Sequence, residues 1–225
     1  MKAKIRVCLA LLTALVFVWG GTALAEGRPA WQNAYRNFIV SGEYRGSLRS
    51  VNPEYSEMLR ERDTSWDGFA MFDLDRDGVP ELLVRADYAM EQIDVFTCTG
   101  KKVVWLGSMG GENFFQAIIR FQDAAYPGVY TLMGGPVMTV DEYTLSGMRI
   151  QHRAIGRTVV DFAGMETLDI TMQVSDQKLY QLLYHTLVSG PDVAEQLIWC
   201  TYTELLTDDY WDLLYLGFTE PIVLK

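Results

Sequence analysis

The chain has 225 residues, of which 49% are hydrophobic and 21% are charged, and 29 acidic residues against 19 basic ones give a net charge of −10. The apolar fraction excludes a disordered chain, and the modest glycine and proline content excludes a fibrous one. The acidic balance excludes nucleic acid as the expected partner, because binding to phosphates requires a basic surface. A chain of this length predicts one domain.

Residues 1–25 have the three parts of a secretory signal peptide. Three basic residues within the first six precede an uncharged apolar run over residues 7–19, and Ala23-Leu24-Ala25 forms a small-x-small cleavage site. An uncleaved anchor is the alternative, but the run is shorter than the about 20 residues that span a bilayer. We therefore expect a secreted, extracellular protein with no membrane span after processing and a single domain over residues 26–225. Cleavage after Ala25 removes three basic residues and no acidic one, so the net charge becomes −13.

Two cysteines, Cys98 and Cys200, remain once Cys8 leaves with the signal peptide. In an exported protein they can form one disulfide, or they can stay as two buried thiols. The sequence leaves both possibilities open. No C-x-x-C spacing is present, which disfavours a redox motif or a cysteine-based zinc site.

The first part of this domain has helical periodicity. Residues 28–40 place apolar side chains at i, i+3, i+4, i+7 and i+8 and predict an amphipathic helix that ends at Gly42. A second short helix is expected over residues 53–62, with Asn52 as its N-cap and with Tyr55, Met58 and Leu59 buried. The polar stretch over residues 41–52 is expected to be the connection between them.

From residue 68 the pattern changes to short strands separated by Gly, Pro, Asp and Asn clusters, as in an antiparallel meander. The strands are expected over residues 68–73, 81–85, 93–97, 102–106, 114–121, 129–133, 137–143 and 168–175. Helical periodicity returns over residues 175–189, an apolar segment covers residues 193–202, and Thr207-Asp208-Asp209 has the character of a helix start. This order of elements predicts an α+β fold, with an antiparallel β-meander flanked by an N-terminal helix and C-terminal helices.

One motif carries recognisable chemistry. Residues 73–81 place carboxylates at positions 1, 3, 5 and 9 and glycine at position 6; these are Asp73, Asp75, Asp77, Glu81 and Gly78. Calcium binds six to eight oxygen atoms, and a short chain that wraps round one point can supply them from alternate residues. The carbonyl of Val79 at position 7 is the expected backbone ligand. A plain hairpin turn would account for Asp77-Gly78 but not for the other three carboxylates.

The D-x-D-x-D-G core matches the start of an EF-hand loop, but Val84 occupies the position where an EF-hand needs glutamate. The residues on both sides are strand-like rather than helical. The motif therefore resembles the strand–loop–strand calcium loops of FG-GAP repeats, the integrin type, and a segment found in exported, uncharacterised proteins of Gram-positive bacteria. This resemblance covers about 15 residues and implies Ca²⁺ held by Asp73, Asp75, Asp77, Val79 and Glu81. A single loop does not predict a propeller, whose blades each take about 40–50 residues.

Signals for catalysis are weak, and we expect no catalytic residue. His152 and His185 stand alone, without metal-ligand spacing. Acidic residues that could serve as paired carboxylates are numerous and unspecific; they include Asp141, Glu142, Asp208, Asp209 and Asp212. Four tryptophans, at positions 66, 105, 199 and 211, could stack on sugars if they formed an exposed row, although core packing is the simpler expectation.

These features together predict an exported, calcium-binding and non-catalytic extracellular binding module of unknown ligand, with a structural ion that ties two strands together. Its partner would be a carbohydrate or a cell-surface protein. The alternative is a secreted hydrolase that acts on glycans through carboxylates.

Overall fold

The computed structural model describes residues 29–53, 56–86, 92–110, 114–121, 128–134, 137–160, 166–169, 179, 198–219 and 223–224. The expected signal peptide lies outside these residues. So does the helix expected over residues 175–189, apart from Leu179, which is helical and buried.

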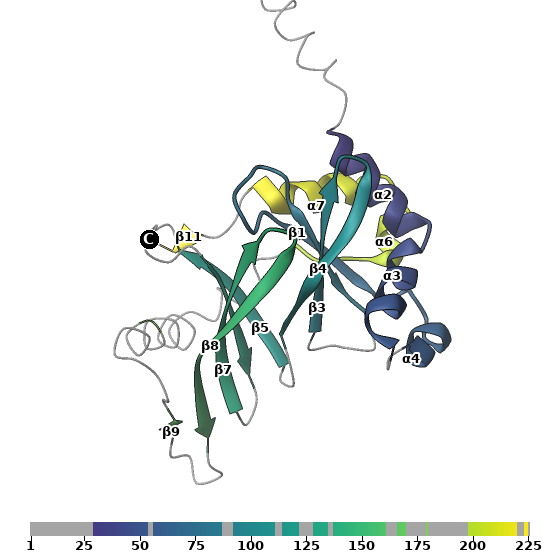
Figure 1. Ribbon diagram of the computed structural model, residues 1–225. Coiled ribbons are helices and arrows are strands. Elements are labelled where there is room, and N and C mark those ends of the chain that lie inside the picture. The colour runs from purple at the N-terminus through teal and green to yellow at the C-terminus, as the bar shows by residue number, and fades with distance from the viewer. Residues whose placement is uncertain are drawn as a thin grey trace, which may run out of the picture.

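The described helices and strands occur in the order that the sequence predicts, helices first, then strands, then helices, apart from a two-residue strand after the last helix (Figure 1). The helices are α2 (Ala30–Val40), α3 (Glu43–Val51), α4 (Ser56–Glu61), α6 (Tyr202–Leu205) and α7 (Asp209–Thr219). The strands are β1 (Gly68–Phe72), β2 (Glu81–Arg85), β3 (Gln92–Thr99), β4 (Lys102–Gly110), β5 (Phe114–Phe121), β6 (Val129–Gly134), β7 (Val137–Ser146), β8 (Arg149–Val160), β9 (Glu166–Asp169), β10 (Cys200–Thr201) and β11 (Val223–Leu224). The expected α+β class is confirmed.

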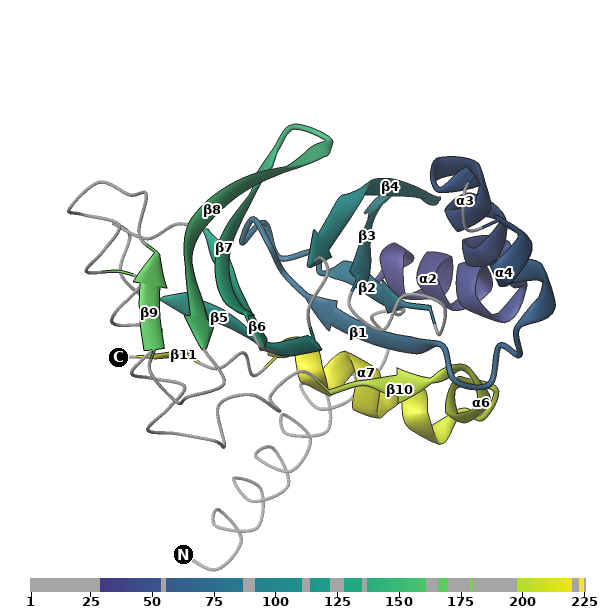
Figure 2. The ribbon, with the colours of Figure 1, turned by 90° about the horizontal axis from the view of Figure 1, so that it is seen from below.

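The strands form two sheets, whereas the sequence suggested a single central meander. The first sheet has the order β10-β1-β2-β3-β4, and the second has the order β11-β5-β6-β7-β8-β9. Each sheet contains its own run of consecutive antiparallel strands, and among the described strands only β11 pairs in parallel, with β5. Figure 2 shows the second sheet on one side of the first and the helices α2, α3 and α4 on the other. The molecule is thus layered, with the first sheet in the middle.

The first sheet is covered on both faces, which explains why β1 and β2 are almost continuously apolar. Successive side chains point to opposite faces of a strand. In β1, Phe69 and Met71 join the core cluster that includes helix residues, while Ala70 and Phe72 join the cluster that includes the second sheet. Apolar side chains at both sets of positions are therefore needed, and all five residues of β1 are buried.

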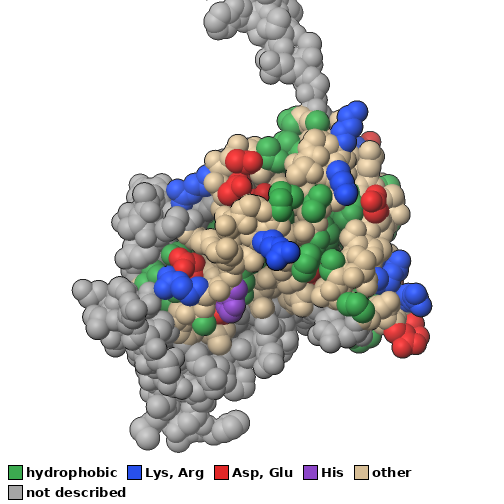
Figure 3. Space-filling view, in the orientation of Figure 1, with side chains coloured by type: hydrophobic (Ala, Val, Ile, Leu, Met, Phe, Trp, Pro, Cys, Tyr) green, Lys and Arg blue, Asp and Glu red, His purple; other side chains and the backbone are tan. Residues whose placement is uncertain are grey.

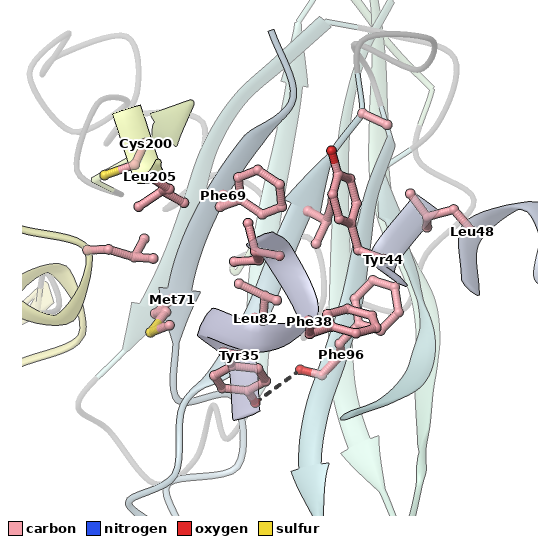
Figure 4. Close-up of a cluster of buried hydrophobic side chains, with 14 of the residues drawn as sticks. Tyr35, Phe38, Tyr44, Leu48, Phe69, Met71, Leu82, Phe96, Cys200 and Leu205 are labelled. Carbon is pink, nitrogen blue, oxygen red and sulfur yellow. Dashed lines mark hydrogen bonds between the residues drawn. The ribbon is translucent and has the colours of Figure 1, made fainter. Parts of the chain in front are cut away.

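The core on the helix side is built from aromatic contacts. Figure 4 shows Phe38 of α2 beside Phe96 of β3, and their ring centroids are 5.1 Å apart in an edge-to-face arrangement. Tyr44 of α3 meets Phe69 of β1 in the same way, also at 5.1 Å. Trp211 of α7 is fully buried in the same cluster and donates its indole N–H to the carbonyl of Leu205 at 2.8 Å. These contacts fix the helices on the sheet.

Helix α3 corrects one prediction, because residues 41–52 were expected to be a polar connection. The helix contains few apolar residues, yet Tyr44 and Leu48 are fully buried and Arg45 is nearly so. Tyr44 and Leu48 are four residues apart and therefore lie on one helix face. Asn52 is the C-cap of α3 rather than the N-cap of the next helix. In α4, Leu59 is buried as predicted, whereas Met58 is exposed and Tyr55 lies outside the described residues.

Strand β8 has no counterpart in the sequence prediction. Its residues 151–154 are exposed, so the strand lacks the apolar alternation that reveals a half-buried strand. It is held by its antiparallel pairing with β7, which extends from Val137↔Val159 to Ser146↔Arg149. Backbone pairing with a neighbour, rather than its own side-chain pattern, makes it a strand.

Cys98 and Cys200 are both free thiols, which decides the question that the sequence left open. Burial raises the pKa of the Cys98 thiol, and burial with the nearby charge of Glu204 raises that of Cys200 to about 11. Both thiols are therefore protonated and weakly nucleophilic at neutral pH.

We expect that a reductant leaves the melting temperature unchanged, and that a thiol reagent labels half-buried Cys98 faster than buried Cys200. A melting temperature that falls with reductant would contradict this.

Candidate metal centre

The acidic loop connects the two most buried strands of the first sheet. The pairing of β1 with β2 ends at Phe72↔Glu81, and residues 73–80 lie between them. Because both strands are held in the middle layer, the two ends of the loop are fixed by the core. The first carboxylate, Asp73, follows directly after β1, and the last, Glu81, is the first residue of β2.

The backbone of the loop turns back on itself through two residues in the left-handed region. Arg76 has φ 64° and Gly78 has φ 87°. Glycine adopts this conformation at no steric cost, which explains its place at position 6 of the motif. The carboxylates support the turn by accepting backbone hydrogen bonds: Asp75 from the N–H of Asp77 at 3.2 Å, and Asp73 from the N–H of Gly78 at 3.1 Å. The chain therefore curls around its own acidic side chains.

Three of the predicted ligands converge. Asp73, Asp75 and Glu81 each offer a carboxylate oxygen, and these three atoms lie within 4.8 Å of one another. Two oxygens bound to the same calcium ion at about 2.3–2.6 Å can be separated by up to about 5 Å. The spacing therefore fits a shared cation, and the group could hold a metal ion. Asp75 is exposed, Asp73 is partly buried and Glu81 is buried, so the cluster opens to solvent on one side.

Glu81 is the unusual member because it is 2% exposed and has two like charges beside it. Its carboxylate accepts a hydrogen bond from the N–H of Leu74 at 2.7 Å and one from the hydroxyl of Thr97 at 3.2 Å. Burial, assisted by the charges of Asp75 and Asp73, raises its pKa to about 8. Burial and the neighbouring aspartates also raise the pKa of Asp75. A bound cation would relieve this repulsion, because it would favour the charged form of each carboxylate.

Asp77 and the carbonyl of Val79 remain predicted ligands. Asp77 lies in the same loop but outside the converging group, and its carboxylate accepts the N–H of Val79 at 2.7 Å. Val84, at the position of the EF-hand glutamate, is fully buried in the core, and strands flank the loop on both sides.

Sequence reasoning missed two residues around this centre, Thr97 and Tyr35. Thr97 belongs to β3, which pairs with β2, and this pairing brings its hydroxyl to Glu81. Tyr35 belongs to α2 and donates its hydroxyl to the carbonyl of Pro80 at 2.7 Å. Neither has a local sequence signal, because each reaches the loop only through tertiary packing.

Of the carboxylates considered for glycan hydrolysis, Asp141 and Glu142 on β7 and Asp208 before α7 have basic partners. Asp141 contacts His152 at 2.7 Å, while its neighbour Glu142 accepts hydrogen bonds from Arg153 and Tyr130, each at 2.7 Å. Adjacent strand residues point to opposite faces, so Asp141 and Glu142 cannot flank one bond. On α7 and just before it, Asp208 pairs with Arg36, and Asp209 and Asp212 lie in the exposed first turn.

The four tryptophans do not form an exposed row either. Trp211 is fully buried, Trp105 and Trp199 pack against the two core clusters, and Trp66 is 72% exposed. Core packing thus accounts for three of them. In the view of Figure 3, acidic side chains occur in separate groups among basic and hydrophobic ones, so this face presents no continuous acidic patch.

Comparison with known proteins adds no relative, since neither the models of known families nor the curated proteins gave a match. Among the described residues, no helix combines the length and the apolar character that a membrane crossing requires.

Proposed function

We propose that this protein is an exported calcium-binding module in which one ion braces the β1–β2 hairpin. The observation that carries the proposal is the convergence of Asp73, Asp75 and Glu81, from a loop with the D-x-D-x-D-G pattern, within 4.8 Å. The resemblance to FG-GAP loops supports the same ligand set, with Asp77 and the carbonyl of Val79 completing it. The exported location rests on the signal-peptide pattern of residues 1–25.

Calcium is favoured over other metals by the chemistry of the donors. The converging side chains offer only oxygen atoms, which suit hard cations, and none of them is the histidine or cysteine that zinc and copper prefer. Magnesium demands a near-ideal octahedron and gives up its water reluctantly, whereas calcium accepts irregular shells of six to eight oxygens. A curled backbone loop with carboxylates at different depths suits the more tolerant ion.

The role proposed for the ion is structural rather than catalytic. With Asp77 and the carbonyl of Val79 added to the three converging carboxylates, the loop itself would supply at least five oxygens and leave few coordination positions for a substrate. By linking the end of β1 to the start of β2, the ion would stabilise the middle layer on which both cores are built. We propose that the module as a whole binds an extracellular partner, a carbohydrate or a cell-surface protein.

Calcium should therefore raise the melting temperature of metal-free protein. At a calcium concentration about 100 times Kd, binding adds about 2.7 kcal/mol, or roughly 5–10 °C for a domain of this size. Differential scanning calorimetry of residues 26–225 after chelation, with CaCl₂ or MgCl₂ added, measures the shift. We expect a clearly smaller effect from magnesium.

The variant Asp75→Asn should lose the calcium-dependent shift while still folding, because Asp75 is exposed. The matched control is Glu61→Gln, which removes an exposed carboxylate at the end of α4 and should keep the full shift. An unchanged melting temperature on adding calcium to the wild type, or an equal shift in Asp75→Asn, would rule out the proposed site.

A further inference from the structure

The hydroxyl of Tyr35 contacts the carbonyl groups of two peptide units, and these units directly precede Glu81 and Thr97 of the metal centre. It donates to the carbonyl of Pro80 at 2.7 Å, and a longer contact of 3.5 Å joins it to the carbonyl of Phe96. Figure 4 shows Tyr35 on α2 with a dashed line to Phe96. The first carbonyl shares its peptide plane with the N–H of Glu81, and the second shares its plane with the N–H of Thr97.

These two peptide planes set the direction of the two side chains that follow them. A peptide unit is planar, so fixing its carbonyl restricts the orientation of the next residue's Cα–Cβ bond. Glu81 and Thr97 are the residues in question, and they are joined by the hydrogen bond from the threonine hydroxyl to the glutamate carboxylate. Tyr35 itself is fully buried, and a hydrogen bond in that environment is costly to leave unmade.

We infer that Tyr35 is a positioning residue for the metal loop, and that ion binding is coupled through it to the docking of α2 on the first sheet. The inference rests on the proposed calcium site. It extends that site from the β1–β2 loop to a helix more than 40 residues earlier in the chain, since Tyr35 and Pro80 are separated by 45 positions. Thermodynamic linkage makes the effect reciprocal. If the docking of α2 raises the affinity for calcium, bound calcium favours the docking of α2 by the same factor.

The variant Tyr35→Phe tests the coupling, because it keeps the ring in the core and removes only the hydroxyl. We expect its calcium Kd, measured by isothermal titration with CaCl₂, to rise by about 5-fold or more, the lower end of typical coupling between sites. The matched control is Tyr143→Phe, which removes another largely buried hydroxyl, the one that accepts the N–H of Gly110 at 2.9 Å. The control is expected to lose stability without a change in calcium Kd.

Hydrogen exchange on the wild-type protein provides a second readout that needs no variant. Adding calcium should slow exchange in residues 30–40 of α2 as well as in β1 and β2, and should leave β7 and β8 unchanged. An equal Kd in Tyr35→Phe and the wild type, or protection of β1 and β2 without any in α2, would overturn the inference and leave the calcium site intact. A wild-type protein that binds no calcium would overturn the proposed function itself.

Discussion

Asp67→Ala should lower the free energy of unfolding by about 3–5 kcal/mol, because it leaves a buried guanidinium without its counter-charge. Asp67 is fully buried, and Arg45 is 7% exposed. Two guanidinium nitrogens of Arg45 donate to the two carboxylate oxygens of Asp67, at 2.8 and 3.0 Å, and the hydroxyl of Tyr44 donates to the same carboxylate at 2.6 Å. Removing the carboxylate of Asp67 therefore leaves three buried hydrogen-bond donors without their acceptor.

The other guanidinium contacts show why this ion pair matters to the fold. Arg45 also donates to the carbonyls of Leu59, Arg62 and Asp63, at 2.8, 2.7 and 3.1 Å. These bonds attach α3 to the segment that leads from α4 into β1. Arg45→Lys should also be strongly destabilising, since an ammonium group cannot reproduce this fork of donors.

Urea denaturation at one pH measures both effects. The control is Asp208→Ala, which breaks an exposed Arg–Asp pair, that with Arg36, at a position where the aspartate side chain is 81% exposed. Exposed ion pairs contribute about 1 kcal/mol or less, so this variant should remain close to the wild type. If Asp67→Ala is no more destabilising than Asp208→Ala, the buried pair does not have the role assigned to it.

The second large effect is a change in the stability of Glu81→Gln relative to the wild type. The variant should be the more stable protein at high pH without calcium and the less stable one with calcium. The pKa of Glu81 is raised from its ordinary value of 4.5 to about 8, so the metal-free folded protein holds this proton more tightly than the unfolded chain. The resulting stabilisation is complete below about pH 4.5 and is lost as the pH rises through about 8. Over that range the loss amounts to about 1.4 kcal/mol for each pH unit. Glu81→Gln removes this contribution because it does not titrate.

Without calcium, Glu81→Gln should therefore be more stable than the wild type at about pH 8.5 and closer to it at about pH 5. Its carboxamide oxygen can still accept the N–H of Leu74, so the buried hydrogen bond survives the change. With calcium the order should reverse, because the variant lacks one ligand charge and should bind the ion at least about tenfold more weakly. The apparent affinity of the wild type should rise with pH as the proton on Glu81 is displaced more easily.

Thermal melts of both proteins at these two pH values, each with chelator and with CaCl₂, give the four comparisons. The difference between the two proteins isolates Glu81 and the loop aspartates coupled to its charge, since carboxylates elsewhere titrate equally in both. A metal-free Glu81→Gln variant that loses as much stability as the wild type between the two pH values would show that Glu81 does not carry the shifted proton.

Local patterns were sufficient where a feature depends on neighbouring residues. The periodicity of α2, the apolar runs of β1 and β2, and the aspartate spacing before Gly78 are all readable along the chain, and each appears in the structure at or near its expected bounds. The same reasoning failed for α3 and β8, whose few apolar positions conceal them. Tyr44 and Arg45 of α3 are buried because Asp67 and Phe69 are opposite them, which no local pattern reveals.

The sequence by itself thus determined the α+β class and the three carboxylates that converge, because both follow from spacing within short segments. Only the tertiary structure decided that the strands divide into two sheets, that Cys98 and Cys200 remain free, and that Thr97 and Tyr35 adjoin the metal centre. The physical reason is the same in each case. A turn or a strand reflects the preferences of adjacent residues, whereas a buried polar group takes whichever partner the packing of distant segments brings within hydrogen-bond distance.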